Sequence, residues 1–171
     1  ILIVGYFSEI KNQLRALRIA SHPKLQCYEF VFIGEKVGSY YNKCLSYAES
    51  MSLKNVKFLN DKECSISKEL SECILLLTTS ITEVLPLIIL EGIASGTPFL
   101  APNIGLISEL KGGIICLNDT DFVERIQSVT SNFEIWEKLS SKAKHCFNES
   151  YKPDVVKQQL SKVIEYFDKR K

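Results

Sequence analysis

The stretch CILLLTTSITEVLPLIILEGIASGTPFLA, residues 73–101, decides the fold of this chain. It contains two short apolar runs, 74–77 and 99–101, separated by a helical pattern at 85–95. The helical pattern begins near Pro86, which is tolerated in a first turn, and stops at Gly96, a residue favoured just past a helix end. A strand, a helix and a second strand in this order form the unit from which parallel sheets are built.

The same alternation extends outward over the first two thirds of the chain. Most of the short runs are apolar throughout, as expected for strands that are buried on both faces. The expected strands are 1–4, 28–33, 56–59, 74–77, 99–101 and 114–117. The expected helices are 9–21, 40–51, 63–71, 85–95 and, after the strand pattern ends, 119–130, 133–148 and 154–169. We therefore predict an α/β fold, a Rossmann-like parallel sheet flanked by helices, with a C-terminal helical tail.

The composition narrows the class of protein. The chain has 171 residues, enough for one domain with its own core, and 46% of them are hydrophobic against 24% charged, which argues against disorder. A net charge of +1 gives no field that could hold nucleic acid. The six cysteines form no Cys-x-x-Cys pair and no His/Cys spacing suited to zinc, so we expect free thiols, no metal site and a reducing, cytoplasmic compartment.

The sequence also gives expectations about membrane contact and about the start of the chain. No apolar run approaches the roughly 20 residues of a membrane span, and no signal peptide is recognisable, so at most peripheral membrane contact is expected. The first residues, Ile-Leu-Ile-Val-Gly, lack a methionine and begin at the edge of a strand. We expect a single domain over 1–171 that is cut from a longer protein.

Ligands of open parallel sheets bind beyond the carboxyl ends of the strands, which directs attention to two turns. These turns are 5–12, after the first expected strand, and 78–83, after the fourth. Neither contains a Gly-x-Gly-x-x-Gly fingerprint or a Gly-Lys-Ser/Thr phosphate loop, which argues against NAD and ATP.

Two carboxylates lie eight residues apart, Glu83 at the end of the second turn and Glu91 in the segment that follows it. Glu91 lies in an almost wholly apolar helical stretch, where a buried carboxylate needs a partner such as the paired hydroxyls of a ribose. The unpaired amides of Leu87 and Ile88 at the helix start suit phosphate oxygens, and Lys11 could add a positive charge. The plainer alternatives stay open: Glu91 in solvent or paired with a lysine, Glu83 as an acid favoured by the helix dipole, and Lys11 as surface charge.

These residues resemble the carboxyl-terminal domain of glycosyltransferase family four. The Glu-x7-Glu motif of that family typically reads Glu-Gly-Phe-Gly-Leu-x-x-x-Glu-Ala-Met-Ala, and this chain has Glu83-Val-Leu-Pro-Leu-Ile-Ile-Leu-Glu91-Gly-Ile-Ala. Residues 95–101 are similar to the Ser-Gly-x-Pro-Val-Ile-Ala segment of the family, and 105–109 to its Gly-Gly-x-Pro-Glu loop. Upstream, residues 4–12 resemble its Gly-Arg-x-x-x-x-Lys loop.

The resemblance implies one half of a GT-B architecture that binds a UDP- or GDP-linked sugar. It implies that Glu91 binds the donor ribose, that Glu83 contacts the transferred sugar and that Lys11 neutralises the diphosphate. It implies further donor contacts from Val84, Leu85, Leu87, Ile88 and Asn12. Transfer in such enzymes retains the anomeric configuration and needs no bound metal or other cofactor.

Three positions depart from the family pattern. Tyr6 stands where the family has a phosphate-binding arginine, Pro86 replaces a glycine, and Leu106 replaces the second glycine of its loop. The loss of one of two cations weakens diphosphate binding unless another basic residue, such as Arg15, substitutes for it.

The family also pairs this domain with an amino-terminal Rossmann-like domain that carries the acceptor. We therefore expect this chain to bind a donor but to transfer poorly alone, in a protein that makes a surface glycan or glycolipid at the inner face of the membrane. The main alternative is a catalytically degenerate Rossmann-like interaction module, which Tyr6 favours. A nucleotide-sugar epimerase or a phosphate-receiver domain ranks last.

Overall fold

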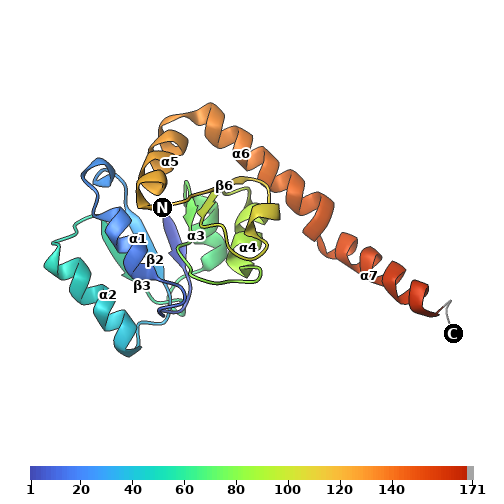
Figure 1. The fold of residues 1–171 in the computed structure, drawn as a ribbon, viewed down its shortest axis with the longest axis horizontal. Coiled ribbons are helices and arrows are strands. Elements are labelled where there is room, and N and C mark those ends of the chain that lie inside the picture. Colours follow the sequence, from blue (N-terminus) through green and yellow to red (C-terminus); the bar gives the residue numbers. More distant parts are fainter. Residues whose placement is uncertain (169–171) are drawn as a thin grey trace.

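The sheet of this protein has six parallel strands in the order β3-β2-β1-β4-β5-β6, seen in a computed structural model that describes residues 1–168. The strands are β1 Leu2–Val4, β2 Phe30–Ile33, β3 Val56–Leu59, β4 Leu76–Leu77, β5 Phe99–Ala101 and β6 Gly113–Ile115. The chain builds the sheet outward from β1 in one direction and, after β3, returns to β4 on the other side of β1 (Figure 1). Beyond the carboxyl ends of β1 and β4 lies the point where the strand order reverses, which is the ordinary ligand position in such sheets.

Helices cover both faces of the sheet. The helices are α1 Gln13–Ala20, α2 Gly38–Ser50, α3 Ile66–Glu72, α4 Leu87–Ser95, α5 Asp119–Ser131, α6 Phe133–Cys146 and α7 Pro153–Asp168. Successive side chains of β1 point to opposite faces, so Ile1 and Ile3 pack into the core beneath α1, α2 and α5, while Leu2 packs beneath α3, α4 and the end of α6. The predicted α/β class, with its Rossmann-like parallel sheet, is confirmed.

Helix boundaries differ from the expected ones where the backbone leaves helical geometry. Residues 9–12 form turns, because Asn12 adopts a left-handed conformation with φ 52° and α1 starts one residue later. Pro86 is extended and caps α4, which therefore begins at 87 and not at 85. The expected helix 133–148 gives way after Cys146 to a turn of π-helix, Phe147–Tyr151.

The expectation that α4 is buried almost all round is wrong. Only Ile89, Gly92 and Ile93 of this helix are buried, because α4 packs on one face of the sheet through a single stripe. Leu87 on the other side is 70% exposed, and the side chain of Glu91 is also exposed. The apolar composition of the segment therefore does not enclose the Glu91 carboxylate.

The last helix, α7, projects from the rest of the molecule (Figure 1) and buries none of its side chains. Residue 169, the last position of the expected helix 154–169, lies outside the described residues. Within residues 1–168, no helix combines the length and the apolar character that crossing a bilayer requires.

Candidate functional site

The loops 5–12 and 78–83 lie side by side at the carboxyl edge of the sheet because β1 and β4 are neighbours. Backbone and side-chain hydrogen bonds join them. The Ile81 amide donates to the Ile10 carbonyl at 2.8 Å, and the Thr79 hydroxyl donates to the carbonyls of Asn12 at 2.9 Å and Lys11 at 3.3 Å. The two turns singled out from the sequence therefore form one continuous structure.

A buried glutamine fixes the first of these loops from within. The Gln13 side chain is 2% exposed and its amide donates to the carbonyls of Tyr6 at 2.9 Å and Gly5 at 3.3 Å. Its side-chain oxygen accepts from the Ser8 amide at 3.4 Å. Sequence reasoning singled out the turn 78–83, which contains Thr79, without giving Thr79 a role, and it overlooked Gln13.

The side chains of Lys11 and Glu83 form an ion pair between the two loops. These side chains are 20% and 15% exposed, so both charges are partly removed from water. The Ser80 hydroxyl donates to the same Glu83 oxygen at 3.1 Å, and the Lys11 ammonium lies 5.7 Å from the centre of the Tyr6 ring. Two of the side chains that the family resemblance assigned to the donor site are thus in direct contact.

A third loop, which follows β5, packs on the backbone of the Glu83 segment. The Leu106 amide donates to the Val84 carbonyl at 2.9 Å. Gly105 has φ +53°, and a Cβ at this position would lie 2.1 Å from the Glu83 carbonyl oxygen. A glycine is therefore required here by both backbone conformation and space.

The loops after β1 and β4 and the start of α4 line a hollow of about 370 Å³. It is lined by Val4, Gly5, Tyr6, Lys11, Ile66, Glu83, Leu85, Pro86, Leu87, Ile88 and Glu91. Within the described residues, the amides of Leu87 and Ile88 at the helix start have no hydrogen-bond acceptor. One cation, two carboxylates, two available amides and an apolar wall thus meet in one hollow.

Glu91 reaches this hollow from the second turn of α4. Its carboxylate forms no hydrogen bond or ion pair with another side chain in the part of the chain that the structure describes. The reason given from sequence, burial in an apolar helix, is wrong. Its position on the lining of the hollow, eight residues from Glu83, is what makes Glu91 a candidate ligand-binding residue.

Two of the expected donor contacts do not line the hollow. Val84 points outward and is 78% exposed, and Asn12 serves as the cap of α1 with its carbonyl held by Thr79. Ile66, from the start of α3, lines the hollow although no sequence pattern had indicated it.

Arg15 does not take the place of the arginine that Tyr6 replaces. Its guanidinium pairs with Asp119 at 2.6 Å and lies 5.0 Å from the centre of the Phe122 ring, so it is held against α5. Among the residues that line the hollow, Lys11 is the one basic side chain, and Tyr6 offers an aromatic ring in place of a second cation.

Comparison with known proteins identifies the family. Residues 1–145 match the model of "Glycosyl transferases group 1". The chain belongs to this family. The predicted resemblance to a glycosyltransferase domain is therefore confirmed at the level of group 1. A search of curated proteins found no match.

Solved glycosyltransferases share the fold of this group 1 domain at low sequence identity. HepE of Anabaena, crystallised with UDP and glucose, superposes with a TM-score of 0.83 and 18% identity over 96% of this chain and 48% of its own. A Rickettsia africae glycosyltransferase gives 0.85 and 16% identity over 99% and 48%. A mutant of TarM from S. aureus, in complex with ligands that include UDP, gives 0.80 and 23% identity over 94% and 34%. The chain thus spans about half of the length of the first two proteins and one third of TarM.

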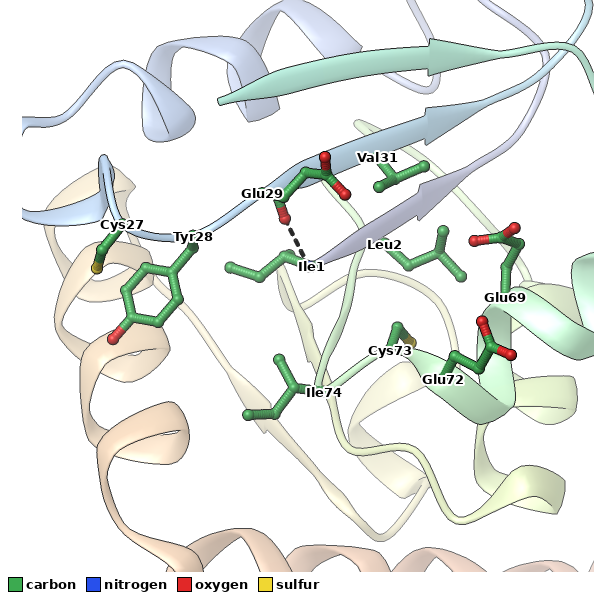
Figure 2. A pocket seen from close by; sticks show the side chains of 10 residues that line it. All are labelled: Ile1, Leu2, Cys27, Tyr28, Glu29, Val31, Glu69, Glu72, Cys73 and Ile74. Carbon is green, nitrogen blue, oxygen red and sulfur yellow. Dashed lines mark hydrogen bonds between the residues drawn. The ribbon is translucent and has the colours of Figure 1, made fainter. Parts of the chain in front are cut away.

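The group 1 domain has a second hollow, of about 400 Å³, at the amino ends of β1 and β2 (Figure 2). Glu29, Glu69, Glu72 and the thiol of Cys73 line part of it, and burial raises the pKa of that thiol. This hollow lies at the sheet edge opposite to the one where α/β folds bind ligands. No three acidic, His or Cys side chains within residues 1–168 are arranged to hold a metal ion.

Proposed function

We propose that this chain binds a UDP- or GDP-linked sugar as the donor half of a retaining glycosyltransferase, which transfers a hexose-type sugar to a glycan or glycolipid. The observation that carries this proposal is the hollow at the carboxyl edge of the sheet, where Lys11, Glu83, Glu91 and the free amides of α4 meet. The bound UDP of HepE, a protein of the same fold, supports the choice of ligand class.

The nucleotide half of the donor is assigned to α4. The available amides of Leu87 and Ile88 carry the positive end of the helix dipole and suit the oxygens of a diphosphate. Glu91, one turn further along the same helix, accepts hydrogen bonds from the ribose hydroxyls. Its unpartnered carboxylate can do so without first breaking an ion pair.

The sugar half is assigned to Glu83, whose carboxylate accepts from sugar hydroxyls and steadies positive charge at the anomeric carbon. Lys11 and the α4 amides stabilise the negative charge that develops on the departing nucleotide diphosphate. These groups supply the stabilisation that a bound metal supplies elsewhere, so we propose transfer that needs no metal and retains the anomeric configuration.

The charges of the lining explain why a second domain belongs in the proposal. Lys11 is opposed by two carboxylates, and a nucleoside diphosphate sugar brings two further negative charges. A further cation from an amino-terminal acceptor domain would restore the balance. The apolar side chains of α7, Val156, Leu160, Val163, Ile164 and Phe167, are exposed and suit a return of this helix onto that domain.

Calorimetry of the 171-residue chain with UDP, GDP and ADP tests the donor site. We expect binding of UDP or GDP, and weaker binding by at least about tenfold after Glu91→Ala, because the ribose hydroxyls lose a charged acceptor. Glu137→Ala is the matched control, since this exposed glutamate lies on α6 away from the hollow. If none of the three nucleotides binds, the donor role is excluded, and unchanged binding by Glu91→Ala excludes Glu91.

The second candidate is an interaction module that has kept the fold and lost transfer. Tyr6 and the single lining cation favour it. Joining the chain to its natural upstream segment and measuring nucleotide release from sugar donors separates the two candidates. A folded but inactive full-length protein favours the module. In either case we propose a cytoplasmic protein with at most peripheral membrane contact.

A further inference from the structure

We infer that Thr79 is a positioning residue for Lys11, and through Lys11 for the donor diphosphate. This inference rests on the proposed function for the diphosphate, but the contact between Thr79 and the Lys11 segment does not. Thr79 lies in the loop after β4, whereas Lys11 lies in the loop after β1.

The Thr79 side chain is placed as a brace between these loops. It is 1% exposed, and its hydroxyl donates to the Asn12 carbonyl at 2.9 Å and to the Lys11 carbonyl at 3.3 Å. Strand pairing alone holds the loops together weakly, because β4 contains two residues and its register with β1 is a single pair, Leu2 and Leu76. The side chain of Thr79 adds a contact at the residue that carries the cation.

The turn at Lys11 and Asn12 is tied to both loops. Asn12 has a left-handed conformation with φ 52°, which asparagine adopts more readily than most other residues that carry a side chain. Contacts within the first loop also hold this turn: the Asn12 amide donates to the Ser8 carbonyl at 2.9 Å, the Lys11 amide donates to the Ser8 hydroxyl at 3.2 Å, and the Arg15 amide donates to the Asn12 carbonyl at 2.9 Å. None of these three contacts comes from the loop after β4. The Thr79 hydroxyl is the contact from the loop after β4 that holds the carbonyls of Lys11 and Asn12. Because Thr79 is buried, water does not replace these hydrogen bonds when the hydroxyl is removed.

A small displacement of this turn would matter at the site. The Lys11 ammonium is aligned with the Glu83 carboxylate and the Tyr6 ring at the end of a long side chain. A change in the backbone torsions at Lys11 redirects its side chain, and the ammonium then contacts the Glu83 carboxylate for a smaller fraction of the time. Loss of the Thr79 hydroxyl should therefore reduce both the Lys11–Glu83 interaction and the affinity for a diphosphate.

The first measurement is the dissociation constant of UDP for Thr79→Val, which keeps the side-chain shape and removes the hydroxyl. We expect binding about five- to tenfold weaker, and recovery to within about twofold in Thr79→Ser, which keeps the hydroxyl. In a chain that also carries Lys11→Met, Thr79→Val should have no further effect on UDP affinity, because its effect acts through the ammonium.

Thr97→Val is the matched control. Thr97 is also a buried threonine, and its hydroxyl donates to the Leu70 carbonyl at 2.7 Å, at the end of α3 and away from the hollow. Its substitution should lower stability to a similar extent and leave UDP affinity unchanged. Equal effects of Thr79→Val and Thr97→Val on UDP affinity overturn the inference.

A second measurement needs no ligand. The coupling between Lys11 and Glu83 is obtained from denaturant unfolding of Lys11→Met, Glu83→Gln and the double variant, with and without Thr79→Val. We expect Thr79→Val to remove most of this coupling, and a coupling that stays unchanged overturns the inference whether or not UDP binds. Loss of the coupling without UDP binding to the unsubstituted chain would support the role of Thr79 and contradict the donor site.

Discussion

The Lys11 ammonium and the Glu83 carboxylate neutralise each other across the two loops that follow β1 and β4. Under the proposed function, a diphosphate competes with Glu83 for Lys11. Glu83 then stays partly buried without its partner unless sugar hydroxyls donate to it. A nucleoside diphosphate sugar provides partners for both Lys11 and Glu83, whereas a nucleoside diphosphate alone provides a partner only for Lys11.

Glu83→Gln should therefore change the relative affinities of donor and product. We expect UDP to bind about threefold or more tightly, because Lys11 is freed and a repulsive charge is removed. UDP-glucose should gain less, since it loses the charged acceptor for its sugar. Calorimetry with both ligands gives the ratio of the two dissociation constants. Glu91→Gln is the control, because it should weaken both ligands alike, and an unchanged ratio in Glu83→Gln contradicts the exchange of partners.

Gly105→Ala should destabilise the site from the loop after β5. A Cβ at Gly105 would lie 2.1 Å from the Glu83 carbonyl oxygen and 2.4 Å from that of Val84, at a positive φ. We expect a loss of about 2–4 kcal/mol in the free energy of unfolding, together with weaker nucleotide binding.

Gly38→Ala separates the steric part of this effect. Gly38 also has a positive φ, +89°, but nothing lies within 4 Å of its Cβ position. Its substitution should cost about 1 kcal/mol, the strain of the backbone alone. Urea unfolding of both variants gives the comparison, and similar losses would show that the contact with Glu83 has no steric cost.

Most of the fold was accessible from sequence because each element carried its own local pattern. All six strands were predicted near their observed positions, since strands buried on both faces are apolar throughout. Helix ends were predicted less well where the conformation of one residue changes the direction of the backbone. The left-handed turn at Asn12 and the extended Pro86 delayed α1 and α4, and no composition pattern marks such conformations with certainty.

Only part of the candidate site could be predicted from the sequence. Lys11 and Glu83 were each assigned to the donor site from the family resemblance, but their ion pair with each other was not predicted. Whether Glu91 is buried or exposed stayed open, because apolar composition does not tell which side of a helix faces the sheet, and the structure shows it exposed. Thr79 was missed for another reason: a side chain that binds the backbone of a loop 67 residues away leaves no periodic pattern.

The cysteines should differ sharply in reactivity. Cys27 is exposed, whereas burial raises the pKa values of Cys44 and Cys116 to about 12. At pH 8 we expect a thiol reagent to modify Cys27 rapidly and the other two only in denaturant, because the thiolate is the reactive form. Mass spectrometry after timed alkylation identifies the sites, and Cys27→Ser should remove the fast phase. Rapid modification of Cys44 without denaturant would contradict the observed packing.

The same two thiols should make stability depend on pH. Their folded-state pKa values lie above the value of about 8.5 for an unperturbed cysteine, so the unfolded state releases protons first as pH rises. The contribution of these two thiols to the free energy of unfolding should therefore be constant below about pH 8 and decrease between about pH 8.5 and 12. Cys44→Ala should reduce the slope in that range, as measured by urea unfolding at a series of pH values.

Removal of α7 should leave the stability of the chain nearly unchanged. Helical stability in proteins comes mainly from packing, and α7 buries no side chain. We expect a chain that ends at residue 152 to unfold within about 2 °C of the full chain and to aggregate less, because a stripe of exposed apolar side chains is removed. A chain that ends at residue 139 is the control, since it also loses Ala143 and Cys146 from the core beneath α4 and should unfold at a much lower temperature. A large loss of stability on removal of α7 alone would show that its apolar face packs on this domain in solution, and would contradict its proposed role as a contact for a second domain.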